Sequence, residues 1–343
     1  MLLTRRRLMG ATLALSTLAA AAACTGPSDR PNAPPAGGPG DTFPRTVEHK
    51  FGSTEIAAAP QRVVSVGLTE HDVLLQLGVI PVGVTEWYGQ QESATWPWAT
   101  ALLGDARPAV LSTADGLQFE RIASLTPDLI IGTNAGLEQA DYDRLSEIAP
   151  TVVSITGSVP YFSPWRDQTL QIARALGREA DGQKLIDAVD TKAADIVAKH
   201  PDWKGRTATF SQGKPYEGNL WVYPDGLNTD FLTDLGFTIT PGLEEFVPET
   251  GGQAQISAEN AARIDADVIV FATDSSDTYD ALMKFATIKN LAAVKERRAV
   301  YTDAILAGAI YFMTPLSQLY VLDRLPALLE AATQGKGSVG YPT

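Results

Sequence analysis

The sequence predicts an α/β fold: two similar lobes with mainly parallel sheets, joined by one long α-helix, with a ligand cleft between the lobes. Three observations predict it. Short β-rich runs alternate with helical patterns, which favours parallel sheets. One amphipathic helical pattern is much longer than the others and covers residues 178–200. The stretches before and after this pattern share two spacings, which indicates a duplicated lobe.

The N-terminal segment is typical of an export signal. Three consecutive arginines follow Thr4, and an apolar run of small residues leads to the single cysteine, Cys24. The arginines resemble a twin-arginine signal, and the four residues ending at Cys24 resemble a lipobox, in which the cysteine is lipidated. We predict a signal peptide over 1–23 and lipidation of Cys24, with a plain cleavage site as the alternative. The mature protein is then exported, by the twin-arginine or the general route, and anchored to the outer face of the cell membrane.

Composition limits the partners. The 343 residues are 45% hydrophobic, which is enough for a core in each of two lobes. The formal net charge of −13 argues against nucleic acid or an anionic membrane face as a partner. No second apolar run reaches about 18 residues, so we expect membrane contact through the lipid anchor only. The single cysteine excludes an intrachain disulfide.

The first lobe is predicted over 45–176. A tether over 24–44 precedes it, and its Pro and Gly content predicts disorder. The lobe begins with a short hairpin within 43–56. Strands are then expected at 62–66, 82–84, 129–132 and 151–155, and helices at 69–78, 119–125, 142–148 and 164–176.

The linking helix is predicted over 177–201. Its apolar stripe consists of Leu185, Ile186, Val189, Ala193, Ile196 and Val197. Gly177 can close the preceding helix, and Pro201 favours a stop. Gly182 opposes the pattern, at a cost of about 1 kcal/mol relative to Ala. A helix of this length is a rod of roughly 35 Å.

The second lobe is predicted over 202–334, followed by a tail over 335–343. Its strands are expected at 207–210, 267–271 and 299–301, and its helices at 228–235, 256–264, 291–295 and 316–332.

Two matches relate the lobes to each other. Leu77-Gly78-Val79 corresponds to Leu235-Gly236-Phe237, and the eight-residue spacing Glu120–Asp128 corresponds to Glu259–Asp267. Ligands of parallel sheets bind beyond the carboxyl ends of the strands. Two such lobes on either side of a rod would therefore share one cleft.

With these stretches described, the chain resembles the helix-backbone (class III) substrate-binding proteins of ABC importers, in particular their iron-siderophore branch. The stretches that carry the resemblance are 60–65, 77–84, 125–131, the helix from Arg178, and 291–301. The resemblance implies a monomer that captures a ferric siderophore and delivers it to an ABC permease with its ATPase. It also implies no catalytic residues and no cofactor, because the iron arrives and leaves chelated.

The resemblance further implies a role for the two matched glutamates. In this family one surface glutamate on each lobe docks into arginine pockets of the permease, and the motif places these roles on Glu120 and Glu259. The alternative for each is an acid that is stabilised at the N-terminus of a helix by the helix dipole.

Polar and aromatic residues in loops after strands are the candidates for ligand contacts. Ferric siderophores are large and only partly polar, so they suit aromatic walls with a few hydrogen-bond donors. Trp96 and Trp98 flank Pro97 and are expected to pack locally instead. The candidates are Thr69, Trp87, Tyr88 and Asn134 in the first lobe, and Lys214, Tyr216, Trp221, Tyr223, Asp274 and Tyr311 in the second.

The charges favour one siderophore class. Catecholates are strongly anionic and need several arginines, but the expected cleft loops offer few; Arg166 opens a helix and Arg297-Arg298 lie in a distant turn. A neutral or cationic hydroxamate is therefore favoured. Haem and cobalamin remain alternatives, since the same scaffold carries them.

Other function classes find little support. His49, His71 and His200 lie in different regions, so we expect surface positions for them and no metal site, with His71 closest to the cleft. The sequence has no G-x-S-x-G elbow, Walker A loop or G-x-G-x-x-G. A cell-surface hydrolase or reductase remains the alternative of another class, and a receptor for a protein partner is a second one.

Overall fold

Buried runs of Val, Ile and Leu form the sheet of the N-terminal lobe. The computed structural model describes residues 42–249, 251–285 and 287–342. In the N-terminal lobe five strands pair in parallel in the order β5-β4-β3-β6-β7. Their bounds are β3 (Val63–Ser65), β4 (Gly83–Thr85), β5 (Ala109–Leu111), β6 (Leu129–Gly132) and β7 (Thr151–Val153).

Helices cover both faces of this sheet because its side chains alternate between two cores. Val63 and Leu129 join a cluster with α1 and α5, whereas Val64 and Ile130 join a second cluster with α3 and α4. A hairpin of β1 (Arg45–His49) and β2 (Gly52–Ile56) precedes the sheet, as expected. The helices are α1 (His71–Gln76), α2 (Thr100–Leu103), α3 (Phe119–Ser124), α4 (Gln139–Ser146) and α5 (Trp165–Ala175).

The C-terminal lobe has a larger and mixed sheet, in the order β11-β9-β8-β12-β13, with β10 beside β8. Strands β8, β10, β12 and β13 pair in parallel, and β9 runs antiparallel to both of its neighbours. The strands are β8 (Thr207–Gln212), β9 (Asn219–Tyr223), β10 (Thr238–Ile239), β11 (Ala254–Ser257), β12 (Val268–Ala272) and β13 (Ala299–Tyr301). The helices are α7 (Asp230–Thr233), α8 (Ser276–Lys284), α9 (Ala292–Lys295), α10 (Ala304–Phe312) and α11 (Pro315–Thr333).

Part of this lobe differs from the prediction. The helix expected over 256–264 is wrong: strand β11 occupies its start, and only a 3₁₀ turn at Ala261–Ile264 remains helical. Pairing with β9 satisfies the backbone of β11 and overrides the weak local propensity.

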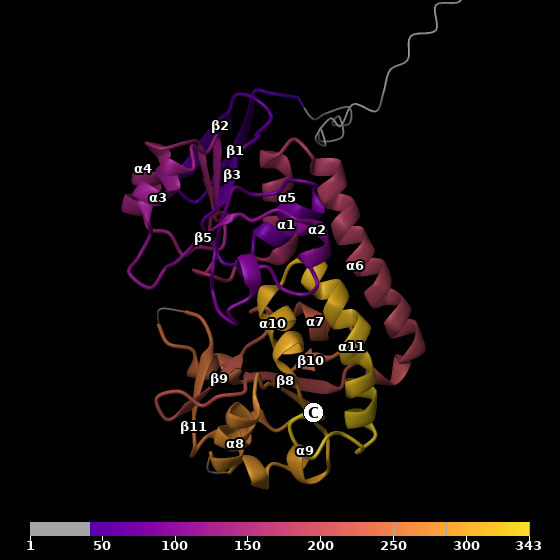
Figure 1. Cartoon of the computed structure of the whole chain (residues 1–343). Helices are drawn as coiled ribbons and strands as arrows, with labels where there is room; N and C mark the ends of the chain where they lie inside the picture. The colour runs from indigo at the N-terminus through magenta and orange to yellow at the C-terminus, as the bar shows by residue number, and fades with distance from the viewer. Residues whose placement is uncertain (1–41, 250, 286, 343) are drawn as a thin grey trace, which may run out of the picture. The chain divides into compact units, whose positions relative to one another are not determined.

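The predicted linking helix is present as α6 (Glu179–Lys199) (Figure 1). It packs against α5 of the N-terminal lobe and α11 of the C-terminal lobe. Packing, rather than helix propensity, explains the glycine at position 182. A Cβ on Gly182 would lie 2.4 Å from the Cβ of Ala173 on α5. The glycine therefore allows α5 and α6 to approach closely. Because α11 also contacts α1 and α5, the lobe limits 45–176 and 202–334 stay a prediction.

The two sequence matches between the lobes have equivalent structures. The carboxylate of Asp128 accepts the backbone N–H groups of Gln61 and Arg62, at 2.7 and 2.8 Å, just before β3. The carboxylate of Asp267 accepts the N–H of Thr207 at 2.8 Å, at the start of β8. Asp128 precedes β6 and thus connects β6 to β3, and Asp267 precedes β12 and connects β12 to β8.

The matched glycines also correspond. Gly78 and Gly236 have φ values of +75° and +91° and end α1 and α7 in the left-handed conformation. The predicted signal peptide and Cys24 lie outside the described residues. Within the described residues, no helix is long and apolar enough to cross a membrane.

Candidate functional site

Both lobes contribute to one cavity of about 270 Å³. Several parallel strands of the two sheets deliver residues to it beyond their carboxyl ends. Trp87 and Tyr88 follow β4, Asn134 follows β6, and Lys214 and Asp274 follow β8 and β12. This is the position expected for a ligand of parallel sheets.

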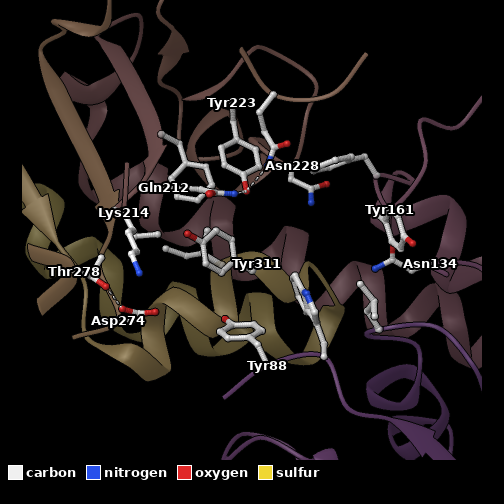
Figure 2. A pocket seen from close by; sticks show the side chains of 18 residues that line it. Tyr88, Asn134, Tyr161, Gln212, Lys214, Tyr223, Asn228, Asp274, Thr278 and Tyr311 are labelled. Atoms are coloured by element: carbon white, nitrogen blue, oxygen red, sulfur yellow. Dashed lines mark hydrogen bonds between the residues drawn. The ribbon is translucent and has the colours of Figure 1, made fainter. Parts of the chain in front are cut away.

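Figure 2 shows how the cavity is arranged. Lys214 and Asp274 lie at one end, and Asn134 and Tyr161 lie at the other. Tyr311, from α10, stands between the two ends, with Tyr88 on one side of it and Tyr223 on the other. The cavity therefore has charged groups at one end and neutral polar groups along the rest of its length.

Most of the candidates from the sequence line this cavity, and their role in binding stays a prediction. The candidates that line it are Trp87, Tyr88, Asn134, Lys214, Tyr223, Asp274 and Tyr311. Thr69 does not: it is fully buried, and its hydroxyl accepts a hydrogen bond from the Asn134 side-chain amide at 3.0 Å. Thr69 thereby orients Asn134 from behind.

Two further candidates lie outside the cavity lining. Tyr216 is 59% exposed and packs beside Trp221, with ring centroids 6.2 Å apart. Trp221 was expected in a loop, but it lies on strand β9. The strand fixes its side chain away from the cavity lining, so position after a strand was the wrong criterion for it.

The sequence reasoning missed several lining residues. Tyr161 and Phe162 lie in the loop after β7, but eight and nine residues beyond its end, so they are further from their strand than Trp87 and Tyr88 are from β4. Gln212 ends β8 and could have been found from the strand expected at 207–210, whereas Asn228 and Gln253 lie beside β9 and β11, which were not expected as strands. The missed residues are Leu68, Tyr161, Phe162, Phe210, Gln212, Gly213, Asn228, Gln253, Ala272, Thr278 and Ile310.

An aromatic cluster forms one wall of the cavity and joins the two lobes. The rings of Trp87 and Tyr88 meet edge to face at 4.8 Å, and Tyr88 lies 6.1 Å from Tyr311 of α10. Behind them Trp96 and Trp98 stack at 5.0 Å, which agrees with the packing role expected for them. Such pairs stabilise the wall beyond their buried area.

Three tyrosine hydroxyls of the cavity, on Tyr88, Tyr223 and Tyr311, remain protonated donors. Burial raises the pKa of Tyr88, Tyr223 and Tyr311 above the ordinary value. The hydroxyl of Tyr88 is buried and has no hydrogen-bond partner within the described residues, so it can form a hydrogen bond with a ligand. Neutral phenols suit donation to the oxygens of a chelate rather than direct bonding to iron.

The charges of the cavity nearly cancel. Lys214 and Asp274 are its only ionisable cation and carboxylate, and no arginine appears among the described lining residues. Arg166 is engaged elsewhere, where it pairs with Asp190 of α6 at 2.5 Å and Asp234 at 2.8 Å. Arg166 is therefore held outside the lining of the cavity.

The histidines differ from the expectation of surface positions. His49 is 3% exposed and bonds to the Thr54 hydroxyl at 2.9 Å, and His71 is fully buried. His200 stacks on Trp203 with ring centroids 4.0 Å apart. His49 and His71 are therefore buried rather than on the surface, whereas His200 is half-buried against Trp203. Within the described ranges, no group of three or more His, Cys, Asp or Glu is placed to hold a metal ion.

Comparison with known proteins identifies the family. The model of the periplasmic binding protein family matches residues 63–306, from β3 of the first lobe to α10 of the second. The chain belongs to this family. The family assigned from the sequence is therefore confirmed, and its members bind solutes rather than transform them.

Individual periplasmic binding proteins cover most of the chain. A probable siderophore-binding lipoprotein of Bacillus subtilis, YfiY, is 31% identical over 286 residues, which are 78% of this chain and 83% of that protein. A periplasmic solute-binding protein of Mycobacterium smegmatis is 42% identical, with a TM-score of 0.77, over 84% of this chain and 98% of its own.

A third relative has been solved with its ligand. PiaA of Streptococcus pneumoniae, in complex with ferrichrome, is 30% identical with a TM-score of 0.73, over 84% of this chain and 99% of its own. These structures include both lobes, so the predicted fold class is confirmed.

Proposed function

We propose that this periplasmic binding protein captures a ferric siderophore outside the cell and delivers it to the permease of an ABC importer. The cavity between the lobes carries the proposal, because it combines aromatic walls, several neutral donors and nearly cancelling charges. A chelate presents oxygen atoms around a desolvated metal, and phenol and amide donors can bond to them without displacing the metal. The YfiY and PiaA relatives support the ligand class.

The absence of arginines from the described lining favours a hydroxamate over a catecholate. A catecholate chelate carries several negative charges, and Lys214 alone would leave most of them unpaired in the cavity. A ferric trihydroxamate has little net charge and loses less hydration on entry. The protein performs no reaction on the ligand and holds no cofactor; chelated iron is its cargo.

Titration of the mature protein with ferric hydroxamates, ferric catecholates, haem and cobalamin tests this function. Tryptophan fluorescence can report binding because Trp87 lines the cavity. We expect a ferric hydroxamate to bind with micromolar or tighter affinity and to be recovered intact after unfolding. If none of the compounds bind at micromolar concentration, the proposed function is wrong; if haem or cobalamin alone bind, the ligand class is wrong.

Delivery requires the two matched glutamates and the lipid anchor. Glu120 on α3 and Glu259 after β11 are both exposed, and neither forms an ion pair within the described residues. Two free carboxylates, one on each lobe, can pair with arginines of a permease. We propose these as docking residues of a monomeric protein that is anchored to the membrane through Cys24.

A further inference from the structure

A second cavity adjoins the one described above. We call it the side cavity; its volume is about 280 Å³, and it shares Tyr88 and Asp274 with the main cavity. Its other lining residues are Gly89, Gln91, Trp96, Ser275 and Ala304. The main cavity lies at the low end of the size range of small-molecule sites. If a ligand carries an arm on its chelate, the side cavity would therefore have room for that arm.

Asp274 is the charged group between the two cavities. One carboxylate oxygen, Oδ1, accepts hydrogen bonds from the hydroxyls of Ser275 at 3.0 Å and Thr278 at 2.5 Å, which hold the side chain in place. The other oxygen has no donor and no ion-pair partner within the described residues. Asp274 thus presents a fixed carboxylate with one oxygen available for a ligand.

Aromatic rings complete the side cavity. The rings of Tyr88 and Trp96 lie 5.1 Å apart and both line it. Electron-rich rings attract ammonium groups. Trp96 is buried with Trp98 stacked on it, and it borders the side cavity together with the exposed Asp274. The hydroxyl of Tyr88 is buried without a partner in the described structure, and it can accept a hydrogen bond from an ammonium group.

Asp274 is the one charged side chain among the described lining residues of the side cavity. No lysine or arginine appears among its described lining residues. Burial, then Tyr223 and then the charge of Asp274 raise the pKa of Tyr88, and burial is followed by Asp303 and Asp274 in raising that of Tyr341. Asp274 is the acid that acts on both tyrosines, and Tyr88 lines the side cavity. Lys214 lines the main cavity only, where the chelate oxygens would lie.

We propose that the side cavity binds a primary ammonium group on an arm of the ligand, between the Asp274 carboxylate and the rings of Tyr88 and Trp96. The preferred substrates are then ferric hydroxamates that end in a protonated amine. This inference rests on the proposed function and specifies its substrate class. Lys214 faces the oxygen atoms of the chelate and Asp274 faces the charged arm, so each charge of the protein meets a complementary part of one ligand.

A matched pair of ligands tests the inference. The first is a linear ferric trihydroxamate with a free terminal amine; the second is the same chelate with that amine acetylated, which removes the charge and keeps the chelate. We expect the wild-type protein to bind the amine form about tenfold more tightly. Asp274→Asn should lower the affinity for the amine form by about that factor and leave the affinity for the acetylated form unchanged.

The acetylated ligand also shows whether each variant is folded. Asp277→Asn is the matched control, because Asp277 is an exposed acid in the first turn of α8 that lines neither cavity. This control should keep the wild-type preference. Equal wild-type affinities for the two chelates, an equal loss for both in Asp274→Asn, or loss of the preference in Asp277→Asn would each overturn the inference. Failure of both chelates to bind the wild-type protein would also overturn the inference, whereas the proposed function fails only if none of the compounds in the wider titration bind.

Discussion

At the scale of single residues, Asp72 is a buried carboxyl that bridges the two lobes. It lies on α1, and its Oδ2 accepts hydrogen bonds from Trp98 Nε1 at 2.8 Å and from the Thr314 hydroxyl, at the start of α11, at 2.7 Å. Its other oxygen has no donor within the described residues and lies 3.9 Å from His71 Nε2. Burial raises the pKa of Asp72 to about 7, against the effect of the two hydrogen bonds.

This carboxyl should make stability depend on pH. A carboxyl with a raised pKa in the folded state stabilises that state fully below its unfolded pKa of 3.8 and loses this effect as the pH rises through 7. His71 adds no charge there, because burial lowers its pKa to about 4. Asp72→Asn stays neutral, so the difference in unfolding free energy between this variant and the wild type should shift in favour of the variant by about 3 kcal/mol from pH 5 to pH 8.

Chemical denaturation at both pH values measures this difference. Subtraction of the wild-type curve removes the effect of Glu70, the neighbouring buried acid, because both proteins contain it. The exposed substitution Asp277→Asn should follow the wild type at both pH values. A constant difference between Asp72→Asn and the wild type would contradict the prediction.

Single residues show most clearly what could and could not be predicted from the sequence. Position after a parallel strand correctly placed Trp87, Tyr88 and Lys214 in the cavity lining. The same criterion did not distinguish Thr69, which bonds to Asn134 from behind, because it gives the location of a loop and not the direction of a side chain. The bridge from Asp72 to Thr314 joins residues 242 positions apart, so no local pattern could reveal it.

At the scale of elements, α6 depends on a close contact at Gly182. The contact joins it to Ala173 of α5, and helices with a small residue on each side can approach closely. The sequence predicted the ends of α6 to within one or two residues, because its amphipathic period is long and regular. Strands β9 and β11 escaped prediction because their stability comes from antiparallel pairing with neighbouring strands, which a local pattern does not show.

Gly182→Ala should therefore destabilise the protein although alanine favours helices. The added methyl group would meet the Cβ of Ala173 at 2.4 Å and force α5 and α6 apart. Overpacking of this kind costs about 1–3 kcal/mol, more than the gain of about 1 kcal/mol in helix propensity. Thermal or chemical unfolding measures the net loss.

Gln183→Ala is the matched control, because Gln183 is exposed at the adjacent position of the same helix. We expect its stability to stay within about 0.5 kcal/mol of the wild type. A gain in stability for Gly182→Ala would show that the two helices can separate at no cost, and would remove the structural reason given for this glycine.

At the scale of the whole molecule, ligand capture and delivery should be separable. Glu120→Ala combined with Glu259→Ala removes both proposed docking acids, and neither lines a described cavity. Uptake of the ferric chelate by cells should fall at least about tenfold, since both charge-assisted contacts are lost, while the affinity of the purified protein stays unchanged. Radioactive iron uptake and fluorescence titration measure the two quantities.

Cys24→Ala provides the comparison within the same experiment. This variant should also lose uptake, but by release from the membrane fraction, whereas the double glutamate variant should remain in that fraction. Loss of ligand affinity in the glutamate variant would show that these residues have another role. Retention of the Cys24→Ala protein on membranes would exclude the lipid anchor.

The paired aspartates Asp128 and Asp267 have a consequence for how this protein can change. Each secures the beginning of a strand, whereas the ligand-facing loops with Trp87, Asn134, Lys214 and Asp274 follow the ends of strands. The contacts that hold neighbouring strands together thus lie at one edge of each sheet, and the residues that face the ligand lie at the opposite edge. Substitutions that change which chelate binds can accumulate at the ligand-facing edge while the contacts of Asp128 and Asp267 stay intact. The same fold can therefore acquire a new ligand without loss of these contacts.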